Sequence, residues 1–405
     1  MSFRASPAGL HPSGCRPASW FAALMAIAMA AEAIAAPRIP PSDATVLEHV
    51  PAAAAAQKLD ALRARLMSHP QDVQGALVLA QGYLDIGRSN ADPRFVSYAE
   101  ATLNPLLHRP DPDPAVLTLA ATTLQYLHRF DEALSLLNRA LQEQPRNGQA
   151  WLTKASILQL QGHFDEGRKA CRQLIQSGGQ LIALTCLSSV NAMTGKLGAS
   201  YTALGRIFND GPGLPAGVRV WILDQLGDMA ERSGDSLRAE GYLRRALQVA
   251  PQDGYSKAEY ADLLLRENRA AEVISLLRVD EQQDNLLLRL AIAGSRLHES
   301  AGERWSDEFQ ARFEAARRDG DYTHLREQAR FLLEVRHEPF EALRLAVQNW
   351  QVQREPDDIR IYLAAAQAAG NRQATNAILG WIHQTGYEDH ALQANGDGIG
   401  RPPGG

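Results

Sequence analysis

The sequence predicts an all-α fold: a right-handed superhelical solenoid of about nine helical hairpins, preceded by a signal peptide. Three observations predict it. Residues 114–147 are followed by 148–179 with nearly the same order of small, large and helix-ending positions. Apolar residues recur every three to four positions along most of the chain, which indicates helices with one buried face. Runs of apolar residues at a period of two, the pattern of a half-buried strand, are missing.

Four positions define the repeat in the 114–147 block. Ala121 is followed after twelve residues by Ala133, after seven more by Ala140, and after five more by Pro145. Small residues let paired helices approach closely, and proline ends the second helix because it has no N–H to donate. This spacing resembles that of the tetratricopeptide repeat (TPR) family, and the resemblance covers most of the chain. It implies hairpins that stack into a right-handed superhelix, with the first helix of each hairpin on the concave face.

The first 35 residues are interpreted as a signal peptide. Arg4 and Arg16 form a positive leader, an apolar run covers residues 20–31, and small residues precede Ala36. An uncleaved anchor is the alternative, but the run is short for a membrane span. We therefore expect an exported protein, cleaved near Ala36. The Ala- and Arg-rich composition favours a bacterial protein, and hence the periplasm.

The rest of the chain divides into a lead segment, a solenoid and a tail. Residues 36–69 should hold a polar, Pro-rich lead and an N-terminal capping helix, which covers the open end of the array. The TPR solenoid is expected over 70–388. Residues 389–405 are polar and rich in Gly and Pro, so we expect a disordered tail there.

The solenoid divides into nine units. Their approximate bounds are 70–113, 114–147, 148–180, 181–216, 220–253, 254–283, 285–318, 322–355 and 356–388. The first unit carries an insertion, because Gly87 to Ala99 spans twelve residues where His128 to Ala133 spans five. Asp92-Pro93 should break the helix within it. The unit at 285–318 keeps the helical period with longer elements, so we interpret it as divergent.

Catalytic, metal and nucleotide motifs are absent from the sequence. It has no HExxH, no GxSxG, no phosphate loop and no Cys/His set with zinc spacing. We therefore expect no enzyme activity, no catalytic residue, no metal, no cofactor and no small-molecule substrate. A net charge of −5 with no basic stripe also disfavours nucleic acid as a partner.

The resemblance implies a binding groove on the first helices. TPR ligands usually contact positions 2, 5, 9, 12 and 13 of these helices. In the first three units these positions carry mostly amides, hydroxyls and a tyrosine, which suit an extended backbone or a helix. The partner-binding candidates are Gln81, Asp85, Thr118, Thr122, Gln125, Tyr126, Ser156 and Gln159. The Lys/Arg/Asn clamp that other TPR proteins use for chaperone C-termini is missing at these places.

The fifth unit differs because acids occupy the same positions. Asp224, Asp228 and Glu231 fall on one helix face, where their repulsion must be offset. They form either an acidic patch for a basic partner segment or a solvated helix face, and the solvated face is favoured.

Cys171 and Cys186 are a candidate disulfide. They fall on helices expected to pack side by side, and an exported protein experiences an oxidising compartment. Two free thiols on buried faces are the alternative.

The sequence thus predicts a non-catalytic adaptor of the bacterial cell envelope. It would bind a peptide or helical segment of another envelope protein in the concave groove. Two alternatives remain open: a structural scaffold of an outer-membrane secretion or polysaccharide-export assembly, and an accessory factor in enzyme or cytochrome maturation.

Overall fold

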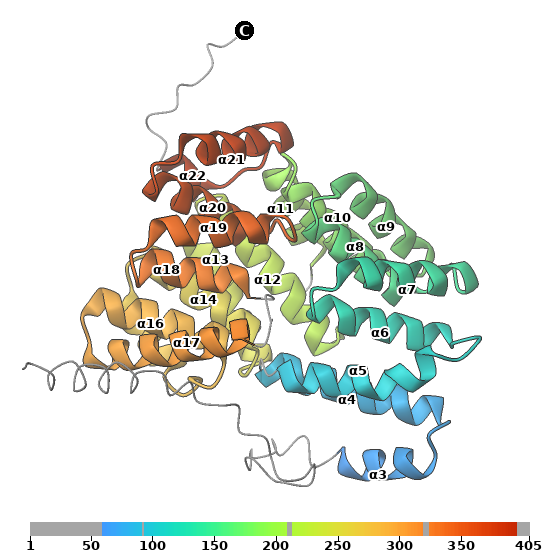
Figure 1. Cartoon of the computed structure of the whole chain (residues 1–405). Helices are drawn as coiled ribbons and strands as arrows, with labels where there is room; N and C mark the ends of the chain where they lie inside the picture. Colours follow the sequence, from blue (N-terminus) through green and yellow to red (C-terminus); the bar gives the residue numbers. More distant parts are fainter. Residues whose placement is uncertain (1–58, 91–92, 209–212, 319–323, 395–405) are drawn as a thin grey trace, which may run out of the picture. The chain divides into compact units, whose positions relative to one another are not determined.

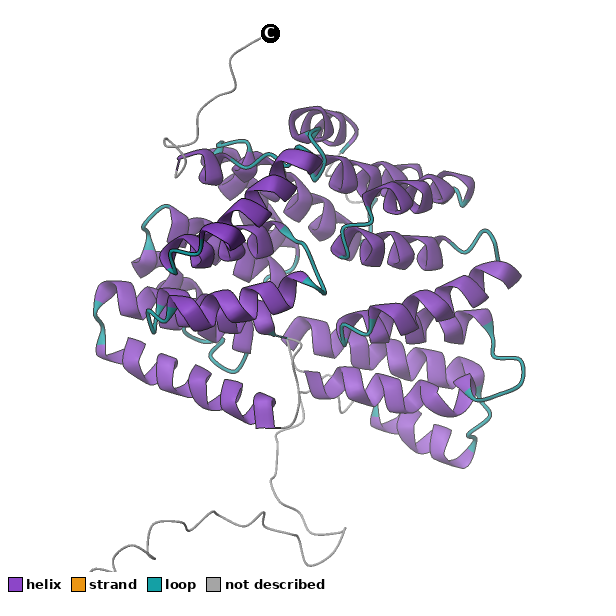
Figure 2. Cartoon of the chain, turned by 45° about the horizontal axis from the view of Figure 1, so that its top comes forward, coloured by secondary structure: helices purple, strands orange, loops and turns teal. Residues whose placement is uncertain are grey.

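The computed structural model describes residues 59–90, 93–208, 213–318 and 324–394. These residues form helices, turns and loops, with no strand among them (Figures 1 and 2). The all-α prediction is therefore confirmed. The predicted signal peptide and residues 36–58 of the predicted lead segment lie outside the described residues. Within the described ranges, no helix has the length and apolar character needed to cross a membrane.

Among the described residues, nine helical hairpins follow the short helix α3, as the repeat predicts (Figure 1). The helices are α3 (Asp60–Ser68), α4 (Val73–Asn90), α5 (Pro93–Leu107), α6 (Pro114–Tyr126), α7 (Phe130–Glu143), α8 (Gly148–Leu160), α9 (Phe164–Gln176), α10 (Gln180–Ala192), α11 (Leu197–Ile207), α12 (Ala216–Arg232), α13 (Ser236–Val249), α14 (Gly254–Arg266), α15 (Ala270–Leu277), α16 (Asp284–Leu297), α17 (Ser300–Arg318), α18 (Leu325–Glu334), α19 (Pro339–Trp350), α20 (Pro356–Ala368), α21 (Arg372–Thr385) and α22 (His390–Ala394). The even-numbered helices from α4 to α20 are the first helices of the hairpins.

Side-chain caps explain where several first helices begin. The Asp113 carboxylate accepts from the Ala115 N–H at 2.8 Å, and the Asn147 amide oxygen accepts from the Ala150 N–H at 3.0 Å. These acceptors satisfy backbone donors that a first helical turn leaves without partners. Because the two caps are 34 positions apart, they mark one full repeat.

The small residues of the repeat lie where helices approach closely. Ala121, Ala133 and Ala140 are all 0% exposed, as their spacing predicts. The insertion in the first unit mainly lengthens its first helix: α4 has 18 residues, whereas α6 has 13. The predicted break agrees with the start of α5 at Pro93, where proline is tolerated because a first-turn N–H has no helical partner.

Turns between paired helices repeatedly use a left-handed residue. Gly162, Gly195 and Gly234 have φ angles of 79°, 71° and 84°, a region that glycine enters without a Cβ clash. His128 and Asn268 occupy equivalent turns at φ 55° and 60°.

The C-terminal hairpins pack against the third to fifth hairpins. Residues of α8 to α10 and of α17 to α21 share one hydrophobic core, in which the Phe164 and Trp381 rings lie 6.2 Å apart. The Arg354 N–H donates to the Leu160 carbonyl at 2.8 Å. The inner side of these hairpins is therefore partly enclosed by the chain itself.

The predicted tail begins later than expected. Asp389 is 3% exposed and α22 covers 390–394, so the expectation of disorder from residue 389 is wrong for 389–394. The physical reason is an ion pair: the Arg360 Nε donates to the Asp389 carboxylate at 2.8 Å. Residues 395–405 lie outside the described residues.

The capping helix is shorter in its described part than predicted. The apolar period of the sequence predicts this helix over about residues 53–67, within the lead segment 36–69, and α3 covers Asp60–Ser68. Residues 53–58 are not described. Leu59 lies against Gly82 of α4, where an added Cβ would come within 2.9 Å of the leucine Cδ2.

Candidate binding surface

The predicted groove residues of the first unit are exposed and paired with each other. Gln81 and Asp85 lie one turn apart on α4, and the Gln81 Nε2 donates to the Asp85 Oδ1 at 2.9 Å. Both side chains are exposed, so they remain accessible to a partner.

The two predicted threonines of α6 are more engaged. Thr118 is 5% exposed; its hydroxyl donates to the Pro114 carbonyl at 2.7 Å and accepts from the Asn147 Nδ2 at 3.2 Å. Thr122 is half-buried, donates to the Thr118 carbonyl at 3.1 Å and lies 3.4 Å from the Thr153 hydroxyl of α8. Both therefore support the joint between α6 and α8 more than they offer free hydroxyls.

Tyr126 lies where the first two hairpins approach the sixth. It is 43% exposed. Burial of the hydroxyl and the nearby Asp85 and Asp253 carboxylates raise its pKa, although Arg88 opposes the shift. Arg88 of α4 also lies 3.9 Å from the Asp253 carboxylate, the N-cap of α14.

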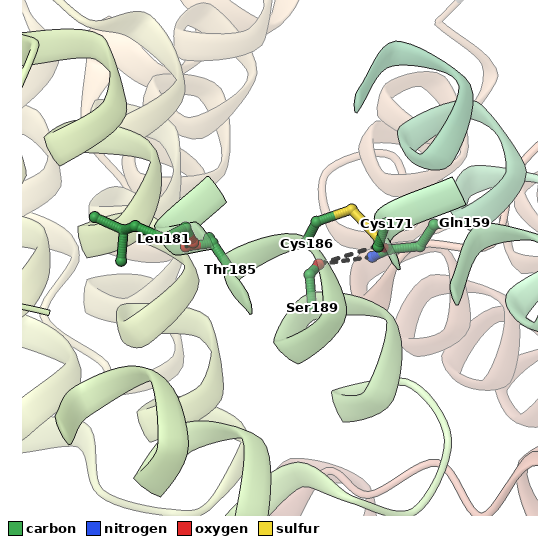
Figure 3. The surroundings of a disulfide bond; sticks show 6 residues. All are labelled: Gln159, Cys171, Leu181, Thr185, Cys186 and Ser189. Carbon is green, nitrogen blue, oxygen red and sulfur yellow. Dashed lines mark hydrogen bonds between the residues drawn. A yellow bond between two sulfur atoms is a disulfide. The ribbon is translucent and has the colours of Figure 1, made fainter. Parts of the chain in front are cut away.

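The remaining predicted residues of the third unit lie on the inner side of α8. Ser156 and Gln159 are half-buried. The Gln159 Nε2 donates to the Ser189 Oγ of α10 at 2.9 Å, so this amide joins two successive first helices (Figure 3). Gln125 is also half-buried, at the C-terminal end of α6.

The three acids of the fifth unit are neither solvated nor unpaired. Asp224 is 5% exposed and accepts from the Ser256 hydroxyl at 2.9 Å. Asp228 pairs with Arg232 at 3.0 Å, and Glu231 accepts from the Arg266 Nη2 at 2.8 Å. The favoured interpretation of a solvated face is therefore wrong. Asp224 is buried against Ser256 of α14, Asp228 is paired with Arg232 of its own helix, and Glu231 is paired with Arg266 of α14.

Burial raises the pKa of Asp224 to about 8, and the Asp253 carboxylate adds to the shift. The Ser256 hydrogen bond and Arg88 lower it without reversing it. Asp224 is therefore largely protonated at neutral pH, and a neutral, covered carboxyl offers little to a basic partner.

Seven first helices, α8 to α20, contribute to one partly open chamber of about 130 Å³. The chamber lies where the C-terminal ends of α8, α10 and α12 meet the N-terminal ends of α14, α16, α18 and α20. Its charged lining consists of five arginines and five carboxylates: Arg232, Arg289, Arg326, Arg354, Arg360, Asp228, Glu259, Glu327, Glu355 and Asp357. The lining is thus polar and close to charge balance.

Two arginines of the chamber are fixed by short contacts. Arg289 binds the Asp262 carboxylate, which is 0% exposed and is also bound by Arg330, a residue outside the lining, with the Arg330 Nη1 at 2.7 Å. Arg326 pairs with Glu355, with Nη1 2.5 Å from the carboxylate. Buried charges in such a network are stable only when each is paired, so the network fixes the wall of the chamber.

The surroundings shift the pKa values of two chamber carboxyl groups in opposite directions. Burial opposes ionisation of Glu327, but Arg326 overcomes it and lowers the Glu327 pKa to about 2. Glu259 has its pKa raised by burial and by the nearby Asp357, Asp262 and Asp228 carboxylates. The chamber therefore contains one carboxyl whose pKa is lowered and another whose pKa is raised.

The predicted groove omitted most of this lining. Of the predicted residues only Gln159 and Asp228 line the chamber. Positions 2 and 5 of the first helices in the sixth, eighth and ninth units would have predicted four more lining residues. These are Tyr255, Arg326, Asp357 and Arg360. Arg354 lies between α19 and α20, where no repeat position would have found it.

A disulfide joins the third and fourth hairpins (Figure 3). Cys171 of α9 and Cys186 of α10 have Cα atoms 5.6 Å apart, and their sulfur atoms are bonded at 1.97 Å. Cys171 is 0% and Cys186 5% exposed. The bridge crosses between hairpins, so it ties two repeats whose inner faces contribute Gln159 and Ser189.

Comparisons with known proteins agree with this architecture. The tetratricopeptide repeat family model matches residues 126–181. No curated protein matches the chain in sequence.

Similar solved structures include a tetratricopeptide repeat protein from Parabacteroides merdae, with 12% identity, a TM-score of 0.36, and coverage of 72% of this chain and 98% of that chain. A human IFIT1 dimer with PPP-AAAA has 14% identity, a TM-score of 0.46, and coverage of 84% and 79%. The P58(IPK) TPR domain has 15% identity, a TM-score of 0.24, and coverage of 78% and 99%. Residues 126–181 thus match the tetratricopeptide repeat family, and the hairpins of the described residues have the repeated arrangement that this family's spacing predicts.

Proposed function

We propose that this protein is a non-catalytic adaptor that holds a segment of another protein against its first helices. The fold supports protein binding in general, because stacked hairpins present a long inner surface. The observation that carries the proposal is the convergence of seven first helices on one polar, charge-balanced chamber. A chamber with both charges suits the amides and mixed side chains of a polypeptide.

The surface beside the chamber is where the partner would first bind. Gln125, Tyr126 and Gln159 lie on α6 and α8, and they combine an exposed aromatic ring with amides that donate and accept. Tyrosine supplies a large contact area with few rotatable bonds. We infer that these three side chains contact the backbone of the partner.

The charge balance of the lining also bears on the class of partner. Five arginines lie among five acidic side chains in the lining, whereas a phosphate backbone requires clustered cations without neighbouring acids. We therefore retain a protein partner over a nucleic acid as the proposal.

A triple substitution tests the groove. Changing Gln125, Tyr126 and Gln159 together to Ala should remove partners recovered by crosslinking in the native host and mass spectrometry. The matched control changes Gln142 and Glu143, exposed residues at the end of the second helix α7. An unchanged set of crosslinked partners in the triple variant, with native circular dichroism, contradicts the proposal.

We further propose that the adaptor works in the bacterial cell envelope, on another envelope protein. The charged leader, apolar run and small residues before Ala36 support export. Mass spectrometry of the exported protein should find an N-terminus near Ala36. Finding Met1 on the exported protein would exclude cleavage.

A further inference from the structure

The chain places its own C-terminal segment across two turns of the array. We call residues 386–394 the C-terminal clasp. The space beside Gly195, in the turn after α10, is taken by Gly386: an added Cβ would lie 3.4 Å from the Gly386 carbonyl oxygen. The space beside Gly234, in the turn after α12, is taken by His390, whose Cγ would lie 3.0 Å from an added Cβ. Two successive turns thus form a seat for this segment.

Arg232 is the first anchor of the clasp. Its side chain is 1% exposed, and its guanidinium lies 4.6 Å from the centre of the Tyr387 ring. Its Nε donates to the Glu388 carbonyl at 3.2 Å and its Nη2 to the Ala192 carbonyl at 2.6 Å. A planar guanidinium that stacks on an aromatic ring and binds backbone carbonyls is a recognition device for a peptide.

Arg360 is the second anchor. It binds Asp389, whose carboxylate also accepts from the Tyr387 hydroxyl at 3.1 Å. Tyr387 and Asp389 are 5% and 3% exposed, so the clasp buries an aromatic ring and, two residues later, a carboxylate. The seat therefore recognises an aromatic residue, one spacer and an acid.

The anchors also belong to the chamber wall, since Arg232 and Arg360 both line it. The clasp itself is short: α22 has five residues, too few for a stable isolated helix. Its polar contacts come from side chains of α12 and α20, and the Tyr387 ring also packs in the hydrophobic core, with its centroid 6.3 Å from that of Trp381. Being part of the same chain, the clasp occupies its seat at a high effective concentration.

We propose that the C-terminal clasp is a built-in competitor, and that its seat binds a segment of a partner protein carrying an aromatic residue two positions before a carboxylate. The partner displaces the clasp and replaces its contacts with Arg232 and Arg360. The seat is centred on Arg232 and Arg360, which line the same chamber as Gln159. The substitutions that test the clasp and its seat leave Gln125, Tyr126 and Gln159 unchanged, so their outcome can be told apart from that of the groove proposal.

The test uses the full chain and a labelled peptide with the sequence of residues 386–394. Tyr387→Ala with Asp389→Asn should release the clasp, and fluorescence anisotropy should show at least tenfold tighter peptide binding than in the unaltered protein. Adding Arg232→Met to this variant should lower the affinity at least tenfold. A peptide carrying the same two substitutions should not bind.

The matched control is Tyr98→Ala with Asp307→Asn, an exposed tyrosine and an exposed acid outside the clasp. It should bind the peptide as weakly as the unaltered protein. A clasp variant with native circular dichroism that binds no better than this control would overturn the proposal. Equal binding of the substituted peptide would overturn it too.

If the variant with Tyr387→Ala and Asp389→Asn does not fold, hydrogen exchange of the unaltered protein tests whether the peptide displaces the clasp. In the unaltered protein, saturating peptide should speed exchange of the backbone amides of residues 387–392 while leaving α8 unchanged. Exchange of these amides that stays constant at every peptide concentration would show that nothing displaces the clasp. The variant with Gln125, Tyr126 and Gln159 changed to Ala should show the same peptide-dependent exchange of residues 387–392 as the unaltered protein.

Discussion

Single residues in the turns decide how the hairpins meet. Gly162, Gly195 and Gly234 all have positive φ, and each has a part of the C-terminal region in the space where a side chain would lie. Gly178 also has a positive φ of 82°, but no atom lies within 4 Å of an added Cβ. Backbone strain and steric contact can therefore be separated by experiment.

Gly178→Ala and Gly162→Ala form a matched pair. Gly178→Ala should lower the free energy of unfolding by about 1 kcal/mol, because alanine pays the left-handed strain alone. Gly162→Ala should cost about 1 kcal/mol more, since its Cβ would lie 2.6 Å from the Arg354 Nη1, which donates to the Gln161 carbonyl. Guanidinium chloride unfolding measures both values. Equal losses would mean that the Arg354 contact contributes nothing.

The buried carboxyl of Asp224 should make the free energy of unfolding depend on pH. Its pKa is raised by burial to about 8, so the folded state binds a proton that the unfolded chain releases near pH 4. The stability this group contributes is full below about pH 4 and declines as pH rises towards 8. Asp224→Asn stays neutral and can still accept from Ser256, so the variant should gain stability over the unaltered protein across this window, on the order of a few kcal/mol at pH 8.

Thermal unfolding at several pH values measures this gain. Exposed Asp307→Asn is the control and should leave the slope of stability against pH unchanged. A constant difference between Asp224→Asn and the unaltered protein from pH 4 to 8 would show that Asp224 titrates normally in the fold.

At the scale of helices, joints between neighbouring hairpins are made by different chemistry along the chain. α8 and α10 are joined through the Gln159–Ser189 hydrogen bonds, and α9 and α10 through the disulfide. α14, α16 and α18 are joined by Arg289 and Arg330 on the buried Asp262. A paired buried charge is specific in geometry but weak evidence for stability, so the disulfide should be the stronger tie.

Removal of the disulfide tests that ranking. Cys171→Ala with Cys186→Ala should lower the free energy of unfolding by about 3 kcal/mol, the loop-closure value for a bridge over 15 residues. The reduced protein is the control for lost sulfur packing, and should be destabilised by a similar amount. Mass spectrometry of the denatured, unreduced protein should find neither cysteine labelled by a thiol reagent. Full labelling of both cysteines would mean that the bridge is absent in solution.

Over the whole molecule, local patterns could be predicted and distant contacts could not. Ala121, Ala133 and Pro145 revealed the repeat because helix packing and helix ends depend on neighbours in sequence. The contact of Phe164 with Trp381, by contrast, depends on the accumulated rotation of several hairpins, which no single spacing encodes. The same reason explains the binding surface: Gln159 was predicted, but its chamber partners on α14 to α20 lie a turn of the array away.

The shared core makes unfolding of the array cooperative across distant repeats. Repeat proteins whose units contact only their neighbours lose structure locally. Here Trp381 contacts the rings of Phe164, Trp350 and Tyr387, with centroids 6.2, 5.0 and 6.3 Å away. A change at Trp381 therefore acts on the third hairpin as well as on the last two.

Trp381→Ala should lower the free energy of unfolding by about 3 kcal/mol, because it removes a large aromatic side chain from this joint. Hydrogen exchange should quicken in α9 and α10 as well as in α20 and α21, and unfolding should remain a single transition. Leu237→Ala is the control, because this side chain is 85% exposed. It should change neither the free energy of unfolding nor the hydrogen exchange of these helices. Faster exchange confined to α20 and α21 would mean that the C-terminal hairpins are a separate folding unit, and that the third and fourth hairpins do not depend on them.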